Sequence, residues 1–242
     1  MSSKTSALTF KQGFADGIPI GLGYFSVSFG FGVMAVSKGI TALAAMIMSL
    51  TNLTSAGQVA GITIIAAGGT LAEMALAQLI INMRYALMSL SLSQKLDSTF
   101  TLPHRIITSF AITDEIFAVA SSHKDISKNY MYGIMMPPIL CWTSGTILGG
   151  IAGEILPERI KGALGIAIFG MFIAIFIPPA RKSVGVLCVV ILSAVLSCCL
   201  EYIPLFSVVS DGFAIIICTL VAALAGAIFF PVKDSDSEVQ SE

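Results

Sequence analysis

The chain has 242 residues, of which 56% are hydrophobic and only 11% charged, and its formal net charge is −1. Soluble domains carry charge on about a quarter of their residues, so this composition excludes an ordinary soluble fold. The small net charge also gives no electrostatic reason to expect binding to nucleic acid.

The apolar residues gather in runs of about 20, the length that a helix needs to span a bilayer. Seven such runs are expected to cross: residues 17–37, 41–67, 70–93, 130–153, 160–178, 184–202 and 212–231. An eighth segment, 105–122, is short for a crossing at about 1.5 Å per residue. It is expected to be a thin crossing, a re-entrant pair of half-helices or an interfacial helix. The sequence thus predicts an all-α, polytopic membrane helix bundle of seven to eight spans, including broken or re-entrant helices.

Residues 17–231 are expected to form one transmembrane domain, between an N-terminal segment (1–16) and a polar, disordered tail (232–242). If 105–122 crosses, both termini share a side with seven of the Lys and Arg side chains, against five on the other side. The positive-inside rule then predicts that both termini lie in the cytoplasm.

The first span carries Gly13, Gly17 and Gly21 at intervals of four residues, with Pro19 among them. Small residues at this spacing let helices approach closely, which favours a packing role. A proline in a span also marks a kink or an unwound turn. The alternative is therefore that Pro19 and Gly21 expose backbone groups beside a substrate.

The second run contains "SLTNLTSAGQVAG", residues 49–61, with hydrogen-bonding side chains in its middle. One interpretation is a continuous helix whose polar side chains bond to neighbouring helices. The other is a broken helix, because several N-cap residue types precede a glycine that tolerates unusual dihedral angles. A half-helix starting here would direct free N–H groups into a cavity and bind a carboxylate. The candidate substrate-binding residues are Asn52, Thr54, Ser55, Gly57 and Gln58.

The third span carries polar and charged groups on two faces. Gln78, Asn82 and Tyr85 form one helical stripe, from which Asn82 and Tyr85 are candidate substrate ligands. Glu73 and Arg84 lie about three turns apart and cannot pair with each other. A charge in mid-bilayer costs about 2.5–3.5 kcal/mol on insertion scales, so Arg84 needs a partner, water or a route to the interface.

Two acids, Asp114 and Glu115, follow Thr113 in the short segment. They are interpreted either as the first turn of a helix capped by Thr113, or as carboxylates that bind and release a proton during transport. Trp142, the only tryptophan, is either an interfacial anchor or part of an apolar pocket wall.

Five stretches occur in a characteristic order: "ADGIPIGLGYFSVSFGFGVMA", "MSLTNLTSAGQ", "INMRYALMSLSLS", "ITDEIFA" and "PPILCWTSGTILGGIAG". Their order and spacing resemble the AzlC-type family, the large subunit of two-component branched-chain amino acid exporters, over about residues 10–231. The resemblance implies export of valine, leucine or isoleucine across a prokaryotic plasma (inner) membrane. It also implies a small hydrophobic partner subunit of the AzlD type.

Together these features predict a secondary active transporter, coupled to a proton gradient through Asp114 or Glu115, with Arg84 and Glu73 as further charged candidates. The substrate carboxylate is expected at residues 52–58, its ammonium at Asn82, Tyr85 or carbonyl groups near Pro19, and its side chain beside Trp142.

No phosphate-binding glycine loop or metal-ligand cluster occurs in the sequence, so no cofactor or metal is expected. No nucleophile–His–acid constellation indicates an enzyme. The alternatives are a transporter or channel for another small amino acid or small polar solute, and a non-transporting membrane assembly subunit.

Overall fold

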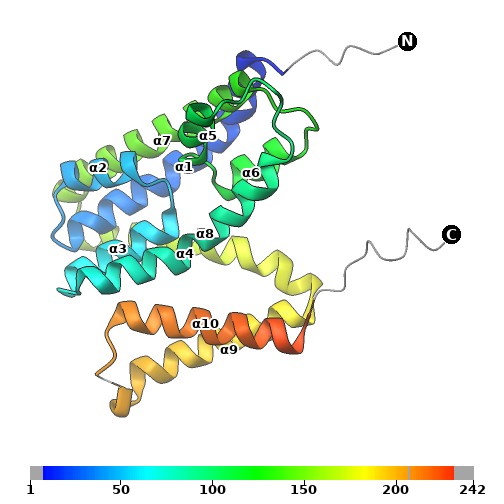
Figure 1. The fold of residues 1–242 in the computed structure, drawn as a ribbon. Helices are drawn as coiled ribbons and strands as arrows, with labels where there is room; N and C mark the ends of the chain where they lie inside the picture. The colour runs from blue at the N-terminus through cyan, green and yellow to red at the C-terminus, as the bar shows by residue number, and fades with distance from the viewer. Residues whose placement is uncertain (1–7, 207, 232–242) are drawn as a thin grey trace, which may run out of the picture. The chain divides into compact units, whose positions relative to one another are not determined.

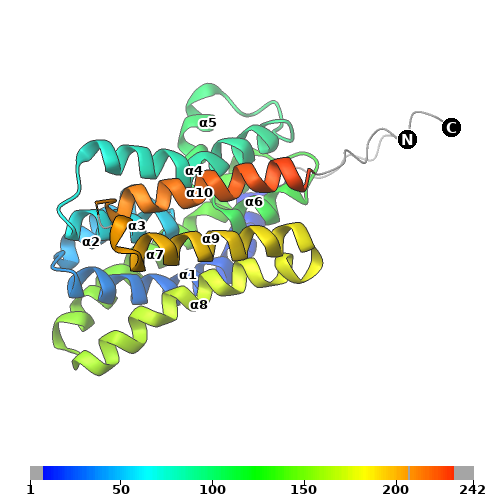
Figure 2. The same ribbon diagram turned by 90° about the horizontal axis from the view of Figure 1, so that it is seen from below.

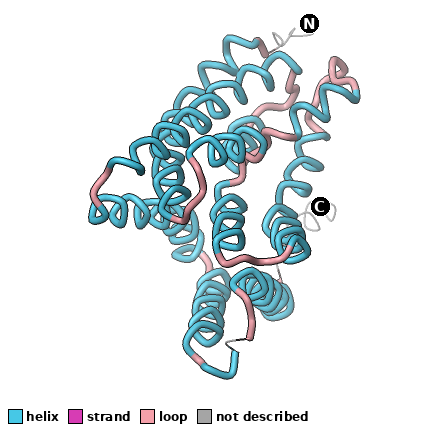
Figure 3. Tube along the Cα trace, turned by 90° about the vertical axis from the view of Figure 1, so that its left-hand side faces the viewer, coloured by secondary structure: helices cyan, strands magenta, loops and turns pink. Residues whose placement is uncertain are grey.

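The computed structural model describes residues 8–206 and 208–231, and within them the regular structure is helical (Figures 1 and 3). The helices are α1 (Phe10–Ser37), α2 (Ala42–Thr51), α3 (Ser55–Ala66), α4 (Leu71–Ser93), α5 (Leu102–Ser109), α6 (Asp114–Ser121), α7 (Lys128–Ile155), α8 (Glu158–Lys182), α9 (Val184–Tyr202) and α10 (Asp211–Phe229). A short 3-10 helix spans Pro204–Phe206.

Six of these helices are long and apolar enough to cross a membrane, which confirms the predicted all-α membrane bundle. They are α1, α4, α7, α8, α9 and α10. The other two apolar segments, 41–67 and 105–122, are each divided into two short helices, which agrees with the expected broken or re-entrant helices.

The chain divides into two compact units. The first contains Met1–Gly68 and Ile81–Phe169, and the second contains Gly69–Ile80 and Gly170–Glu242. Helices α4 and α8 each begin in one unit and end in the other.

Helices α1 and α7 form the centre of the first unit and run parallel to each other. A Cβ atom added at Gly13 would lie 2.1 Å from the carbonyl oxygen of Tyr130, and one added at Gly32 would lie 2.2 Å from that of Thr146. Only hydrogen atoms fit at these positions, so the two backbones touch directly. This confirms the predicted packing role of the glycine stripe in the first span.

Helix α1 continues without interruption past Pro19. Gly21 is buried against Pro137 of α7, whereas Pro19 lies exposed on the helix surface. The expected alternative of an unwound turn with bare carbonyl groups near Pro19 is therefore wrong. A proline removes one helical hydrogen bond, and the close contact with α7 keeps the surrounding residues helical.

The second apolar run is broken between α2 and α3, as the broken-helix interpretation predicted. Helix α2 ends at its C-cap Asn52, and α3 begins after its N-cap Thr54. The Gln58 side-chain amide of α3 donates to the carbonyl of Met48 in the last turn of α2 (3.4 Å). A collinear pair would hold these residues about 15 Å apart, so the chain folds back on itself. Figure 1 shows α2 and α3 running in opposite directions.

The α2–α3 pair enters and leaves the first unit at one end of α7. Ala42, at the start of α2, lies against Gly150 near the end of α7, whereas the α2–α3 link lies near Trp142, midway along α7. The pair is therefore a re-entrant pair of half-helices that reaches the middle of the bundle.

Helices α5 and α6 form a second re-entrant pair, which is one of the three structures expected for residues 105–122. At the start of α6, Asp114 pairs with Arg84 midway along α4, and at its end the Ser121 carbonyl accepts from Lys95 beyond the end of α4. Helix α6 therefore runs back along α4 to the end at which the α4–α5 connection began. The pair enters from the end of the first unit opposite to α2 and α3 (Figure 1).

In the second unit, α9 and α10 lie side by side (Figure 2). Glu73, in the first turn of α4, accepts from the backbone N–H of Gly212 (2.9 Å) and from the Ser210 hydroxyl. This carboxylate therefore caps the N-terminus of α10, where the helix dipole favours a negative charge.

The α1–α7 contact generates a prediction about stability. Gly32→Ala places a methyl group against the Thr146 carbonyl, and overpacking of this kind costs about 1–3 kcal/mol. The melting temperature of the purified protein in detergent is expected to fall by several degrees. Gly23→Ala, on the same helix, meets nothing within 4 Å and gains helix propensity, so it is expected to leave the melting temperature unchanged or higher. Equal melting temperatures for the two variants would contradict the contact.

Candidate functional site

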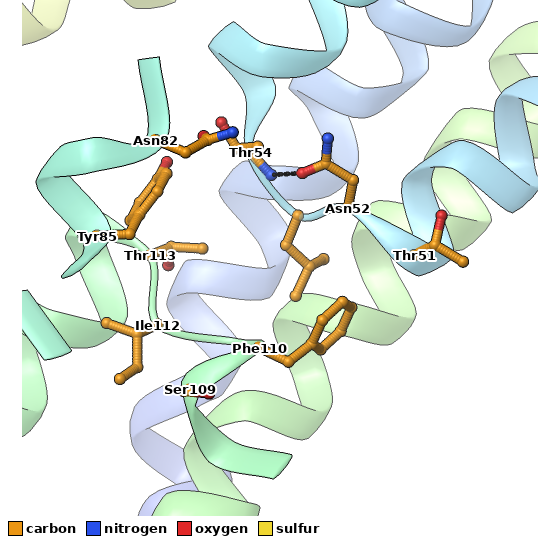
Figure 4. Close-up of a pocket in the computed structure, with 10 residues that line it drawn as sticks. Thr51, Asn52, Thr54, Asn82, Tyr85, Ser109, Phe110, Ile112 and Thr113 are labelled. Atoms are coloured by element: carbon orange, nitrogen blue, oxygen red, sulfur yellow. Dashed lines mark hydrogen bonds between the residues drawn. The ribbon is translucent and has the colours of Figure 1, made fainter. Parts of the chain in front are cut away.

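A cavity of about 150 Å³ lies where the links of the two half-helix pairs approach each other beside α4 (Figure 4). Its lining residues are Thr51, Asn52, Leu53, Thr54, Asn82, Tyr85, Ser109, Phe110, Ile112 and Thr113. We refer to it as the central cavity. All of these residues belong to the first unit.

Four helix ends border the central cavity. Asn52 and Phe110 are the C-caps of α2 and α5, and Thr54 and Thr113 are the N-caps of α3 and α6. The first N–H groups and the last C=O groups of a helix lack intrahelical partners, and they carry its positive and negative dipole ends. Positive and negative helix ends thus meet in one small space.

The N-cap residues fix where α3 and α6, the half-helices that start at the two links, begin. Thr54 Oγ1 accepts from the Gly57 N–H (3.2 Å), and Thr113 Oγ1 accepts from the Ile116 N–H (3.4 Å). The Asn52 side-chain carbonyl accepts from the Thr54 N–H across the link (3.2 Å, Figure 4). The predicted capping by Thr113 is confirmed, with both acids in the first turn of α6.

Helix α4 supplies one wall of the central cavity through Asn82 and Tyr85, whose side chains project from it toward the links (Figure 4). The two residues lie about one helical turn apart on α4, as expected for the predicted stripe. The structure therefore brings four of the predicted substrate-binding residues together: Asn52, Thr54, Asn82 and Tyr85.

Arg84 has the charged partner that its place in a membrane helix requires. Its Nη1 lies 2.8 Å from Asp114 Oδ2, and its Nη2 donates to the Tyr85 hydroxyl (3.0 Å). The side chains of Arg84 and Asp114 are 43% and 36% exposed, so the pair remains accessible from outside the protein core. The pair links the start of α6 to α4 immediately beside the central cavity.

Gln58 lies behind the central cavity, in a buried polar network that holds the α2–α3 link against α7. Its Oε1 accepts from Trp142 Nε1 (3.2 Å) and from the Ser49 hydroxyl (3.3 Å), and its Nε2 donates to the carbonyl of Asn52. The Ser49 and Thr146 hydroxyls are 2.7 Å apart. Gln58 and Trp142 are each only 1% exposed, so both position the link and neither borders the cavity.

The remaining predicted site residues have different surroundings. Ser55 and Gly57 form the first turn of α3, next to the cavity lining. Pro19 and Gly21 lie on the unbroken α1, and Glu73 caps α10 in the second unit.

Glu115 accepts a hydrogen bond from the Tyr24 hydroxyl of α1. Asp114 and Glu115 are adjacent in sequence, yet α6 directs one toward α4 and the other toward α1.

Sequence reasoning missed the second wall of the central cavity, which comes from the end of α5 and the α5–α6 link. It consists of Ser109, Phe110, Ile112 and Thr113. The signal was present, because Thr113 is an N-cap residue inside an apolar stretch, as Thr54 is in the second run. The apolar lining of the cavity also comes from this link and from Leu53.

The family model of the AzlC protein matches residues 19–156, which include every residue of the central cavity. A membrane protein of Archaeoglobus fulgidus is 31% identical over 180 residues, covering 74% of this chain and 79% of its own length. The inner membrane protein YgaZ of Escherichia coli is 28% identical over 234 residues, covering 93% of this chain and 94% of its own length. A membrane protein of Helicobacter pylori is 26% identical over 179 residues, covering 72% and 77%. No solved structure matches the chain.

The family-model match and the similarity to the Archaeoglobus fulgidus protein show that the chain belongs to the AzlC family of membrane transporters.

Proposed function

We propose that this chain is the substrate-binding subunit of a secondary exporter of branched-chain amino acids, driven by a proton gradient and completed by a small hydrophobic AzlD-type subunit. One observation carries the proposal: two positive and two negative helix ends border the same small cavity. A zwitterion is the ligand that satisfies both polarities at once, and every α-amino acid is a zwitterion at neutral pH.

In the proposed complex, the substrate carboxylate accepts from the N–H groups that begin α3 and α6, as anions do at helix N-termini. The ammonium donates to the last carbonyl groups of α2 and α5, assisted by Asn82 and Tyr85. The branched side chain contacts Leu53, Phe110 and Ile112, which supply the apolar lining. The cavity, of about 150 Å³, is of the size that holds a small organic molecule, which favours a small amino acid over a large one.

The Arg84–Asp114 pair is the proposed coupling element. When Asp114 binds a proton, it loses the charge that attracts Arg84, and the contact between α6 and α4 weakens. The α5–α6 pair is then free to move relative to α4 and to change the side of the membrane to which the central cavity is open. Glu115 is less suited to this role because its partner, Tyr24, is neutral and lies on the rigid α1.

The proposed orientation follows from six crossings and two re-entrant pairs, which put the α4–α5 connection on the side of the termini. That side then carries nine cationic side chains and the other three, which is a clear positive-inside bias. The nine are Lys4, Lys11, Lys95, Arg105, Lys124, Lys128, Arg181, Lys182 and Lys233, and the three are Lys38, Arg159 and Lys161. Both termini are proposed to lie in the cytoplasm, with the protein in the plasma membrane of a prokaryote, in keeping with the inner membrane location in the name of YgaZ.

The decisive experiment is counterflow in liposomes that contain this chain together with its partner subunit. Liposomes loaded with unlabelled valine are expected to accumulate labelled valine, leucine and isoleucine, and not labelled lysine or glutamate. Accumulation of a different small amino acid would revise the substrate class. No accumulation of any amino acid would support a non-transporting assembly subunit and refute the proposal.

Loss of the polar wall of the central cavity is expected to weaken substrate binding. Asn82→Ala or Tyr85→Phe removes a hydrogen bond worth about 1–1.5 kcal/mol, which corresponds to about a tenfold higher half-saturation concentration in counterflow. Ser91→Ala is the matched control, because Ser91 lies on the same helix and outside the cavity lining. An unchanged half-saturation concentration in both cavity variants would contradict the proposed site.

Removal of the proposed proton carrier is expected to separate exchange from coupling. Asp114→Asn should retain valine counterflow, which needs no net proton movement, but should lose valine accumulation driven by a pH gradient. Glu115→Gln still accepts from Tyr24 and should keep both activities. If Glu115→Gln loses the pH-driven accumulation and Asp114→Asn keeps it, the coupling role belongs to Glu115.

A further inference from the structure

A second cavity, of about 110 Å³, lies between α4 and α5, and we refer to it as the α4–α5 cavity. Two of its lining residues, Ser109 and Ile112, also line the central cavity. The two cavities are therefore neighbours. Its other lining residues are Ser89, Leu92, Ser93, Leu96, Arg105, Thr108 and Met131.

One face of α4 connects the two cavities. Asn82 and Tyr85 line the central cavity, and Ser89 and Ser93 line the α4–α5 cavity. These residues follow one another at intervals of three and four, so they form a single polar stripe on one side of the helix. At 1.5 Å per residue the stripe is about 16 Å long, or half of a bilayer core of about 30 Å. It leads from the middle of α4 to the end that carries the α4–α5 connection.

Arg105, on α5, lines the α4–α5 cavity, near the end of the stripe that leads to the α4–α5 connection. Within residues 8–206 and 208–231, no carboxylate lies within ion-pair distance of the exposed guanidinium of Arg105. A guanidinium binds a carboxylate through two parallel hydrogen bonds, which suits capture of an amino acid by its carboxylate end.

Ile112 lines both cavities. It is apolar and only 8% exposed, and it belongs to the link between α5 and α6 rather than to a regular helix. Apolar constrictions of this kind block the passage of water and polar solutes until they move. A small movement of the half-helix pair would withdraw Ile112 from the path.

We propose that the α4–α5 cavity is a cytoplasmic station on the substrate path, where Arg105 binds the carboxylate of the amino acid before Ile112 admits it to the central cavity. The inference rests on the proposed function and adds to it a second binding position, a capturing residue and a barrier. It also gives a role in the substrate path to Ser89 and Ser93, the part of the polar stripe that does not line the central cavity.

The first test measures export as the uptake of labelled valine into inverted membrane vesicles, whose cytoplasmic face is outward. Arg105→Gln is expected to raise KM about tenfold with little change in kcat, because it removes charge-assisted hydrogen bonds made only on capture. Arg105→Lys keeps the charge without the paired hydrogen bonds and should give an intermediate KM. Arg159→Gln, which removes an exposed cation outside both cavities, should behave as the unaltered protein.

The second test needs no transport. Single cysteines are introduced in a chain whose native cysteines have been replaced, and a charged thiol reagent is added at the cytoplasmic face. Ser89→Cys should react about tenfold faster than Asn82→Cys, because only the latter lies beyond the apolar barrier. Ile112→Ala should remove that difference, whereas Ile116→Ala, which shortens a buried side chain away from both cavities, should not.

The outcomes separate the two proposals. If the unaltered complex transports valine but Arg105→Gln matches Arg159→Gln, the cytoplasmic station is refuted and the proposed function stands. Equal reactivity of the two cysteines in the presence of Ile112 refutes the barrier. If the unaltered complex transports no amino acid, both the proposed function and the station are refuted.

Discussion

A peptide group that lacks a hydrogen-bond partner in the hydrocarbon core of a membrane costs several kcal/mol, so irregular backbone is restricted to places where protein or water surrounds it. The first unit contains two such places, the α2–α3 and α5–α6 links. The α2–α3 link is tolerated because the Gln58 amide accepts from Trp142 and donates to the carbonyl of Asn52. The cap residues Asn52 and Thr54 determine where the helix breaks, and the Gln58 network gives the break a fixed geometry.

The same constraint determines where polar groups gather in the membrane-embedded part of this largely apolar chain. Each half-helix pair directs one positive and one negative helix end toward the centre, and the uninterrupted α4 supplies the side chains between them. Arg84 and Asp114 contribute opposite charges beside the cavity and cancel each other there. The helix ends and this ion pair thus present both polarities to the proposed zwitterionic substrate.

Local sequence patterns predicted the features that local physics controls. The crowding of N-cap residues around Thr54 and Thr113 indicated helix starts, and the four-residue spacing of glycines in the first span indicated close packing. What the patterns did not contain was the meeting of the two links, because it depends on how α4, α6 and α7 pack. The pairing of Arg84 with Asp114 and the capping of α10 by Glu73 join residues far apart in sequence, so no periodicity indicates them. Gln58 was expected to bind substrate because its residue type alone does not distinguish a ligand-binding amide from one that holds a link in place.

The direct backbone contact between α1 and α7 bears on how the first unit can deform. Helices that slide past one another in shear motions do so by switching side-chain rotamers at their interface, and the glycine positions here have no rotamers to switch. Displacing one backbone along the other would drive a carbonyl oxygen into a neighbouring Cα. These two helices therefore form a rigid core, and in the proposed transport cycle the conformational change is confined to the two half-helix pairs that pack against it.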